Sequence, residues 1–200
     1  MSKMNEIIQN SLAKSTSYTE YRKLVKDLLD KGKSTGPNQS DDLLNYSTLN
    51  DKRMSRLDKK TTLSDETIQA LNQNSNHQTW LLITEGWCGD AAQIAPVINK
   101  MSLESDKVDL KVVLLDENEE LMNQFLTDGS KSIPKLVVLN ENEEVISSWG
   151  PRPSIATKMV NDYKEKHGGL DADFKRDLQV WYNKNKGENI QEDLISFLNK

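Results

Sequence analysis

The second half of the sequence alternates between short apolar runs and longer amphipathic segments, and this alternation constrains the fold more than any other feature. The apolar runs are typical of buried strands, whereas the intervening segments repeat their apolar residues at helical spacing. The expected strands span residues 80–84, 108–115, 135–140 and 144–149, and the expected helices span 88–101, 118–127 and 154–166. Because only residues 141–143 separate the last two strands, these must form an antiparallel hairpin. The order βαβαββα predicts an α/β fold with a mixed central sheet and helices on both faces.

Helices are also expected before and after this unit. Helically spaced apolar residues between 19 and 57 flank a turn-rich loop at 33–40, which predicts a helical hairpin. Ser40 and Ser64 each precede acidic residues and have the pattern of helix N-caps. We therefore divide the chain into three parts. These are an N-terminal helical extension packed on the core (1–61), an α/β domain (62–167) and a C-terminal helical tail (168–200).

Composition and charge exclude several classes of function. The net charge of -5 argues against a nucleic-acid partner, because phosphate contacts need clustered lysines and arginines. We find no N-terminal apolar segment of the signal-peptide type and no apolar run of about 18 residues that could span a membrane. The single cysteine fits a reducing compartment and excludes an intramolecular disulfide. We expect a cytoplasmic protein without membrane or nucleic-acid partners.

The only cysteine, Cys88, lies where the first expected strand gives way to the following helix. The first turn of a helix carries unpaired N–H groups and the positive end of the helix dipole, and both favour a thiolate. Cys88 is therefore a candidate nucleophile. The alternative is a free cysteine that packs as a small hydrophobic side chain.

Three short motifs together resemble the thioredoxin superfamily: Trp87-Cys88-Gly89, Ile94-Ala95-Pro96 and Ile133-Pro134. The form Trp-Cys-Gly-Asp-Ala is similar to a bacterial thioredoxin-like branch with extra N-terminal helices. The resemblance covers about residues 62–167 and implies a thioredoxin fold for that domain. It further implies a cis peptide at Pro134, with the Ile133 backbone against the thiol, where it can pair with an extended substrate. It also implies that the turn containing Gly150 lies beside the cysteine and that Trp87 shapes the rim of a cleft.

Two positions depart from the two-cysteine pattern of the family. The resolving cysteine would stand three residues after Cys88, on the same helix face, but Ala91 occupies that position. The position six residues before Cys88, where many thioredoxins have a buried acid, is Leu82. Without a resolving thiol, Cys88 cannot release a bound partner by internal attack. Single-thiol chemistry that depends on an external thiol or reductase is therefore expected.

Asp90 and Arg152 set the expected charge around the thiol. Asp90 suits the dipole of the first helical turn, but over about 6 Å its charge would oppose a thiolate by roughly 0.7–3 kcal/mol. The helix N-terminus contributes about 0.3–1 kcal/mol in the opposite direction, so we expect Cys88 to be little more acidic than an ordinary thiol. Arg152 would offset Asp90 or hold a substrate carboxylate. The alternative is an arginine bonded only to a loop carbonyl or to solvent.

Three functions fit these residues. In the one we favour, a monothiol oxidoreductase, Cys88 forms a mixed disulfide with a protein or small-thiol disulfide, and an external thiol or reductase resolves it. No cofactor or metal is expected, because His77 and His167 have no metal-ligand spacing with Cys88. The second function is a non-catalytic peptide-binding module with a thioredoxin fold. The third, a peroxide-reacting thiol, is weaker because it requires an acidic cysteine near a resolving thiol.

Overall fold

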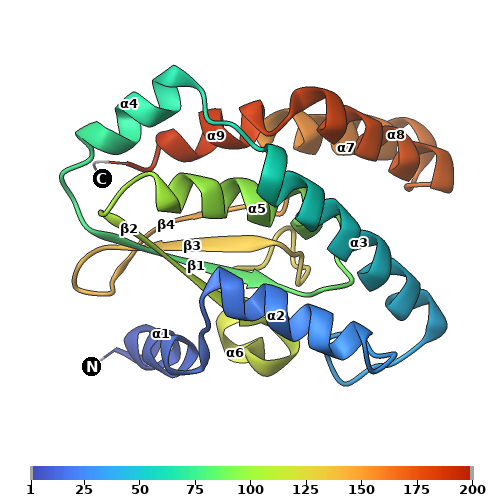
Figure 1. The fold of residues 1–200 in the computed structure, drawn as a ribbon, viewed down its shortest axis with the longest axis horizontal. Helices are drawn as coiled ribbons and strands as arrows, with labels where there is room; N and C mark the ends of the chain where they lie inside the picture. Colours follow the sequence, from blue (N-terminus) through green and yellow to red (C-terminus); the bar gives the residue numbers. More distant parts are fainter. Residues whose placement is uncertain (1, 199–200) are drawn as a thin grey trace.

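A four-stranded mixed sheet forms the centre of the computed structural model, which describes residues 2–198 (Figure 1). The strand order is β2-β1-β3-β4. β1 (Gln78–Thr84) runs parallel to β2 (Val108–Leu114), whereas β3 (Lys135–Leu139) is antiparallel to both β1 and β4 (Val145–Trp149). The predicted mixed sheet is thus confirmed. Met1 and residues 199–200, at the ends of the expected extension and tail, lie outside the described residues.

Helices surround the sheet and account for most of the remaining chain. Those before the sheet are α1 (Lys3–Lys14), α2 (Tyr18–Leu29), α3 (Asp41–Lys60) and α4 (Asp65–Gln73). Between the strands lie α5 (Gly89–Leu103), the 3-10 turn η1 (Leu115–Glu117) and the short α6 (Glu119–Met122). The chain ends in α7 (Ser154–His167), α8 (Ala172–Asn185) and α9 (Glu188–Ile195).

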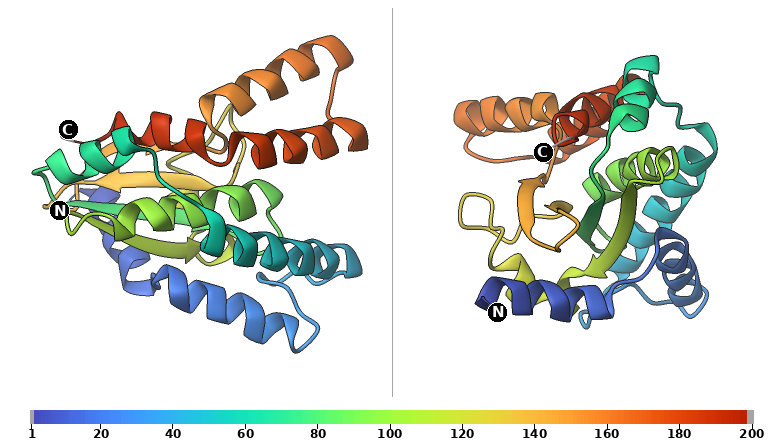
Figure 2. Two further views of the ribbon diagram at one scale, coloured as in Figure 1. Left: turned by 45° about the horizontal axis from the view of Figure 1, so that its top comes forward. Right: turned by 90° about the vertical axis from the view of Figure 1, so that its left-hand side faces the viewer.

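The sheet separates two hydrophobic clusters, because successive side chains of a strand point to opposite faces. Trp80 and Leu82 face the larger cluster, which α5 shares with helices from both ends of the chain. Leu81 and Ile83 face the smaller cluster, which α1 and α6 cover. Helices therefore lie on both faces of the sheet, as predicted (Figure 2).

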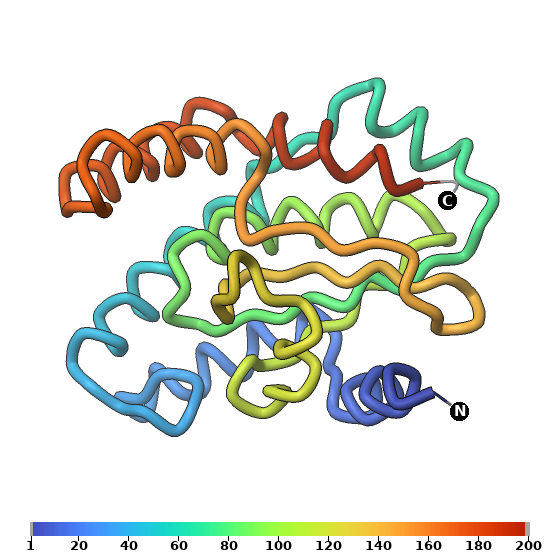
Figure 3. Tube along the Cα trace, turned by 180° about the vertical axis from the view of Figure 1, so that it is seen from behind, coloured from blue at the N-terminus to red at the C-terminus, as the bar shows by residue number. Residues whose placement is uncertain are grey.

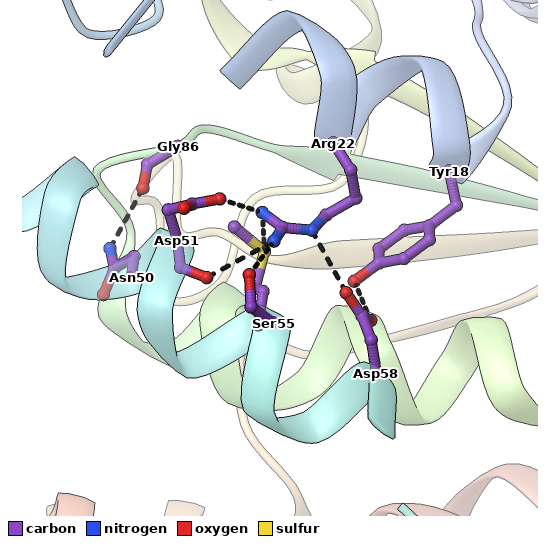
Figure 4. A network of polar contacts seen from close by, with 8 residues as sticks. Tyr18, Arg22, Asn50, Asp51, Ser55, Asp58 and Gly86 are labelled. Atoms are coloured by element: carbon purple, nitrogen blue, oxygen red, sulfur yellow. Dashed lines mark hydrogen bonds and ion pairs between the residues drawn. The ribbon is translucent and has the colours of Figure 1, made fainter. Parts of the chain in front are cut away.

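The predicted helical hairpin is present as α2 and α3, and a polar network holds its two helices together (Figure 4). Arg22 of α2 forms ion pairs with Asp51 at 2.8 Å and Asp58 at 3.3 Å, and it also donates to Ser55 Oγ at 2.9 Å. The Tyr18 hydroxyl donates to Asp58 at 2.8 Å. The arginine side chain is mostly buried, so the network fixes the angle between α2 and α3.

Two helices differ from the prediction. The helix expected over 118–127 is reduced to α6, because Asn118 leaves helical geometry and a turn with the left-handed residues Asp128 and Gly129 follows. Conversely, α1 lies in a segment for which no element was predicted. Its apolar side chains Ile7 and Ile8 are buried, and Met4 and Leu12 are partly buried against the same cluster.

Two helical hairpins project past the same end of the sheet, as the front and back views agree (Figures 1 and 3). One is α2–α3 and the other is α7–α8. This is the end at which β1 finishes and α5 begins. Within the described residues, no helix is both long enough and apolar enough to cross a membrane.

Candidate active site at the start of helix α5

Cys88 is the N-cap residue of α5 and follows the last residue of β1 by a short loop. Its Sγ accepts a hydrogen bond from the Ala91 N–H at 3.5 Å, so the sulfur takes the position that an oxygen usually has in a helix cap. The residue is partly exposed. Two residues from the N-terminal helical region hold the loop before Cys88. Gly86 N–H donates to Thr35 Oγ1 at 2.8 Å, and Asn50 Nδ2 donates to the Gly86 carbonyl at 3.0 Å.

The strand register brings Ile133 and Pro134 to the cysteine. Ile83 of β1 lies opposite Lys135 of β3 in an antiparallel pair, so the residues just after β1 meet those just before β3. The Ile133–Pro134 peptide is cis, and the Cys88 thiol donates to the Ile133 carbonyl at 3.4 Å. The two segments singled out by the family resemblance therefore touch through a sulfur–carbonyl contact.

Gly150 packs directly behind this peptide. It has a φ of +110°, and a Cβ at this position would collide with the carbonyl oxygen of Pro134. Lys135, which is buried, donates from Nζ to the Gly150 carbonyl at 3.1 Å and so ties the turn after β4 to the start of β3. Glycine is thus required here by both conformation and space.

Asp90, in the first turn of α5, has two close partners from distant parts of the chain. Its carboxylate pairs with Arg152 at 2.8 Å, and its Oδ1 accepts from the Tyr182 hydroxyl at 3.0 Å. Burial raises the pKa of Asp90, while the neighbouring Arg152 charge opposes this shift. The carboxylate is therefore held in place between the turn after β4 and α8.

The thiol of Cys88 is less acidic than the sequence predicts. Burial raises its pKa to about 12, and the Asp90 charge acts in the same direction. The amides of Ala91 and Asp90 and the Arg152 charge lower the pKa but do not compensate. The sequence-based estimate was wrong because it weighed the charges and the dipole without the loss of solvation around the sulfur.

Glu85 is a buried acid that sequence reasoning missed. It is fully buried immediately after β1, and its Oε1 accepts from the Asp116 N–H at 3.2 Å. Burial raises its pKa to about 7, although the Thr35 hydroxyl and the Asp116 amide oppose the shift. Among the described residues, Oε2 has no hydrogen-bond partner. The signal in the sequence is an acid that directly follows an apolar strand.

Arg53 of α3 and Gln179 of α8 also reach the start of α5 and were not predicted. A Cβ built on Gly89 would lie 3.7 Å from both Arg53 Nη1 and Gln179 Nε2. Gln179 in turn accepts a hydrogen bond from Gln93 at 2.9 Å. The first turn of α5 is therefore flanked by side chains from the N-terminal hairpin and the C-terminal tail.

The remaining candidates are placed as follows. Trp87 is partly buried and packs against the smaller core cluster, and Ala91 is buried within α5. His77 lies near Asp109 at the opposite end of β1, and His167 stacks on Tyr163 at the end of α7. Residues 2–198 contain no group of three or more histidine, cysteine or acidic side chains that could hold a metal ion.

A family whose description is thioredoxin matches residues 36–164. The chain belongs to the thioredoxin family. The match begins in the loop before α3, so it includes a helix that the sequence analysis assigned to the extension. This thioredoxin-family chain therefore has Cys88, Asp90, Ile133, Pro134, Gly150 and Arg152 gathered at one end of the family fold.

Two solved structures share its architecture. One is a protein of unknown function from Pseudomonas aeruginosa, with 15% sequence identity and a TM-score of 0.60; the match covers 91% of this chain and 96% of the other. The second is an HIV epitope-scaffold, with 16% identity and a TM-score of 0.59, covering 91% of this chain and 97% of the other. At such identities the likeness shows the fold alone. None of the curated proteins matches the chain.

Proposed function

We propose that this thioredoxin-family protein is a thiol–disulfide oxidoreductase of the monothiol type, from the branch with the sequence Trp-Cys-Gly-Asp-Ala. One observation carries the proposal: the sulfur of the single cysteine, Cys88, lies between the Ala91 N–H and the Ile133 carbonyl, beside a cis proline. The amide can stabilise a thiolate, and the Ile133 backbone can align an extended disulfide substrate. Its partners would be a protein or small-thiol disulfide and an external thiol or reductase, as found in a reducing compartment such as the cytoplasm.

The proposed reaction is two thiol–disulfide exchanges. Cys88 loses its proton to solvent, and its thiolate attacks one sulfur of the substrate, forming a new S–S bond while the other sulfur leaves as a thiolate. An external thiolate then attacks the mixed disulfide at the substrate sulfur and releases Cys88 as a thiolate. The substrate disulfide has exchanged one half for the external thiol, and the protein is unchanged.

The resting thiol is protected in this scheme. Burial raises the pKa of the Cys88 thiol to about 12, so the resting thiol is protonated at pH 7. The Cys88 thiol also donates to the Ile133 carbonyl, the group that a strand-like substrate would engage. A bound substrate would compete for that carbonyl and release the sulfur, which couples substrate binding to activation.

The test is intact-mass analysis after incubation with a small disulfide at pH 9. The wild-type protein should gain one substituent, which persists until an external thiol is added, and Cys88→Ser should gain none. Ala91→Cys, which supplies the missing resolving thiol, should shed the substituent without external thiol and end as an internal disulfide. A wild-type protein that gains no substituent would contradict the proposal.

A non-catalytic peptide-binding module is the second candidate, and the raised pKa of the thiol favours it. It predicts that Cys88→Ser binds an extended peptide as tightly as the wild type and that neither protein forms a mixed disulfide. The mass experiment therefore separates the two functions.

A further inference from the structure

The charges around the start of α5 do not balance. Asp90 is the acid at this position, and its carboxylate is already engaged by Arg152 and by the Tyr182 hydroxyl. Arg53 is close enough for its charge to act on Asp90, but it forms no ion pair with any described residue. Arg53, which lies close to Gly89, thus has no ion-pair partner of its own among the described residues.

Arg53 is fixed in place although its charge is unpaired. Its Nη1 donates to Asn50 Oδ1 at 3.0 Å, and Asn50 is itself bound to the Gly86 carbonyl. Burial and the nearby Arg56 charge both lower the pKa of Arg53, so keeping this cation costs free energy. The side chain is partly exposed, which leaves its remaining N–H groups accessible to a ligand.

Arg53 of α3 and Gln179 of α8 both approach Gly89. Both side-chain nitrogens lie 3.7 Å from where a Gly89 Cβ would stand, so they approach the backbone immediately after Cys88. Consecutive Cα atoms are about 3.8 Å apart, so a group bound there lies within a few ångströms of the reactive residue. The convergent groups are a guanidinium and an amide, which are both hydrogen-bond donors to anions.

We propose that Arg53 and Gln179 form a subsite over Gly89 that binds a carboxylate carried by a low-molecular-weight disulfide substrate. The inference rests on the proposed function and names the substrate class for the same cysteine. A carboxylate would supply the ion-pair partner that Arg53 does not have among the described residues, since Arg152 already pairs with Asp90. The carboxylate would orient the disulfide so that one of its sulfurs faces Cys88.

The experiment compares two disulfide probes with the full-length protein at pH 9 and low salt. The anionic probe is 5,5′-dithiobis(2-nitrobenzoate), and the neutral probe is 4,4′-dithiodipyridine. Arg53→Gln should slow the reaction with the anionic probe about five- to tenfold and change the reaction with the neutral probe less than twofold. Arg53→Lys should retain part of the preference, because it keeps the charge without the planar fork.

Lys52→Ala is the matched control, because it removes one positive charge from the neighbouring exposed position of α3. It should leave the ratio of the two rates unchanged, and 0.5 M NaCl should reduce the anionic preference of the wild type but not of Arg53→Gln. Equal loss with both probes, or no loss with either, would overturn the subsite while leaving the thiol chemistry intact. Failure of Cys88 to react with either probe in the wild type would overturn the proposed function and this inference with it.

Discussion

At the scale of single residues, Asp90 adds to the effect of burial in making Cys88 hard to ionise. Its carboxylate lies in the first turn of the helix that Cys88 caps, and its charge adds to burial in raising the pKa of the thiol. Asp90→Asn should therefore lower that pKa, and the rate of alkylation by iodoacetamide at pH 8 should rise about three- to fourfold for each unit by which the pKa falls, because the thiolate fraction grows tenfold while the thiolate becomes less nucleophilic. The measurement is the alkylation rate as a function of pH.

Asp162→Asn on the exposed face of α7 serves as the control, since it removes the same charge far from the thiol. An unchanged rate for Asp90→Asn in a protein with a normal circular dichroism spectrum would show that burial alone sets the pKa. The asparagine can still accept from the Tyr182 hydroxyl, so the first turn of α5 should keep its shape.

Sequence reasoning found the residues whose position follows from local pattern or family motif. Cys88 at a strand-to-helix junction and Ile133 before a proline are of this kind. Arg53, Gln179 and Tyr182 could not be found, because they come from helices far away in the sequence and meet α5 only through packing. The prediction for the pKa of Cys88 was wrong for a related reason, since the desolvation of the sulfur depends on that same packing.

At the scale of elements, the α2–α3 hairpin depends on Arg22. Arg22→Met keeps the apolar stem but leaves Asp51 and Asp58 without a cation, in a place that is largely shielded from solvent. We expect the free energy of unfolding to fall by about 1–3 kcal/mol, less than for a fully buried pair because both acids keep some exposure. Urea denaturation measures this change.

Arg176→Met is the matched control, because Arg176 pairs with two aspartates on the exposed face of α8. Arg176→Met should leave the free energy of unfolding unchanged. Amide exchange should also become faster in the loop before Cys88 in Arg22→Met, since Asn50 on the same helix binds the Gly86 carbonyl. Protection of that loop equal to the wild type would mean that the hairpin does not stabilise it.

The elements themselves were predictable to different degrees. The strands and the long helices appear within a few residues of their expected ends, because their burial gives a clear apolar period. The helix predicted after β2 was too long, because its two buried residues, Leu121 and Met122, suit a single short turn as well as a longer helix. α1 was missed although Met4, Ile7, Ile8 and Leu12 recur at helical spacing, and this apolar stripe was the signal that the sequence offered.

At the scale of the whole molecule, Glu85 should make stability depend on pH. Its folded-state pKa of about 7 lies above the ordinary value of 4.5, so the folded protein holds the proton more tightly than the unfolded chain. The free energy of unfolding should therefore fall as the pH rises from about 4.5 to 7, by up to about 3 kcal/mol from this group. Above about pH 7 the contribution of Glu85 to the free energy of unfolding no longer changes with pH.

Glu85→Gln should remove the pH dependence that Glu85 causes. The variant should be more stable than the wild type at pH 8, and the difference in the free energy of unfolding should be smaller at pH 5. Glu120→Gln, an exposed acid on α6, is the control for the loss of one negative charge. Urea denaturation at a series of pH values measures all three proteins. Parallel curves for the wild type and Glu85→Gln would show that folding does not raise the pKa of Glu85.

Both ends of the chain are integral to the thioredoxin core. Tyr21 and Met54 from the N-terminal helices and Leu178 and Leu194 from the tail lie in the same buried cluster as the sheet residue Trp80. The tail also fastens the turn before α7, where Asp193 accepts from the Trp149 indole N–H and the Ser154 hydroxyl. The sequence indicated that helices precede and follow the core, but not which surfaces they cover.

The peptide groups of Gly86 are satisfied by Thr35 and Asn50 alone among the bonds described, one from the α2–α3 connection and one from α3. A shortened protein that began at the first strand would leave this N–H and this carbonyl bare in an apolar setting, two residues from the sulfur. Such minimal versions would need new partners for both groups before they could present the cysteine correctly. The leading helices thus support the reactive loop from outside, through Thr35 and Asn50.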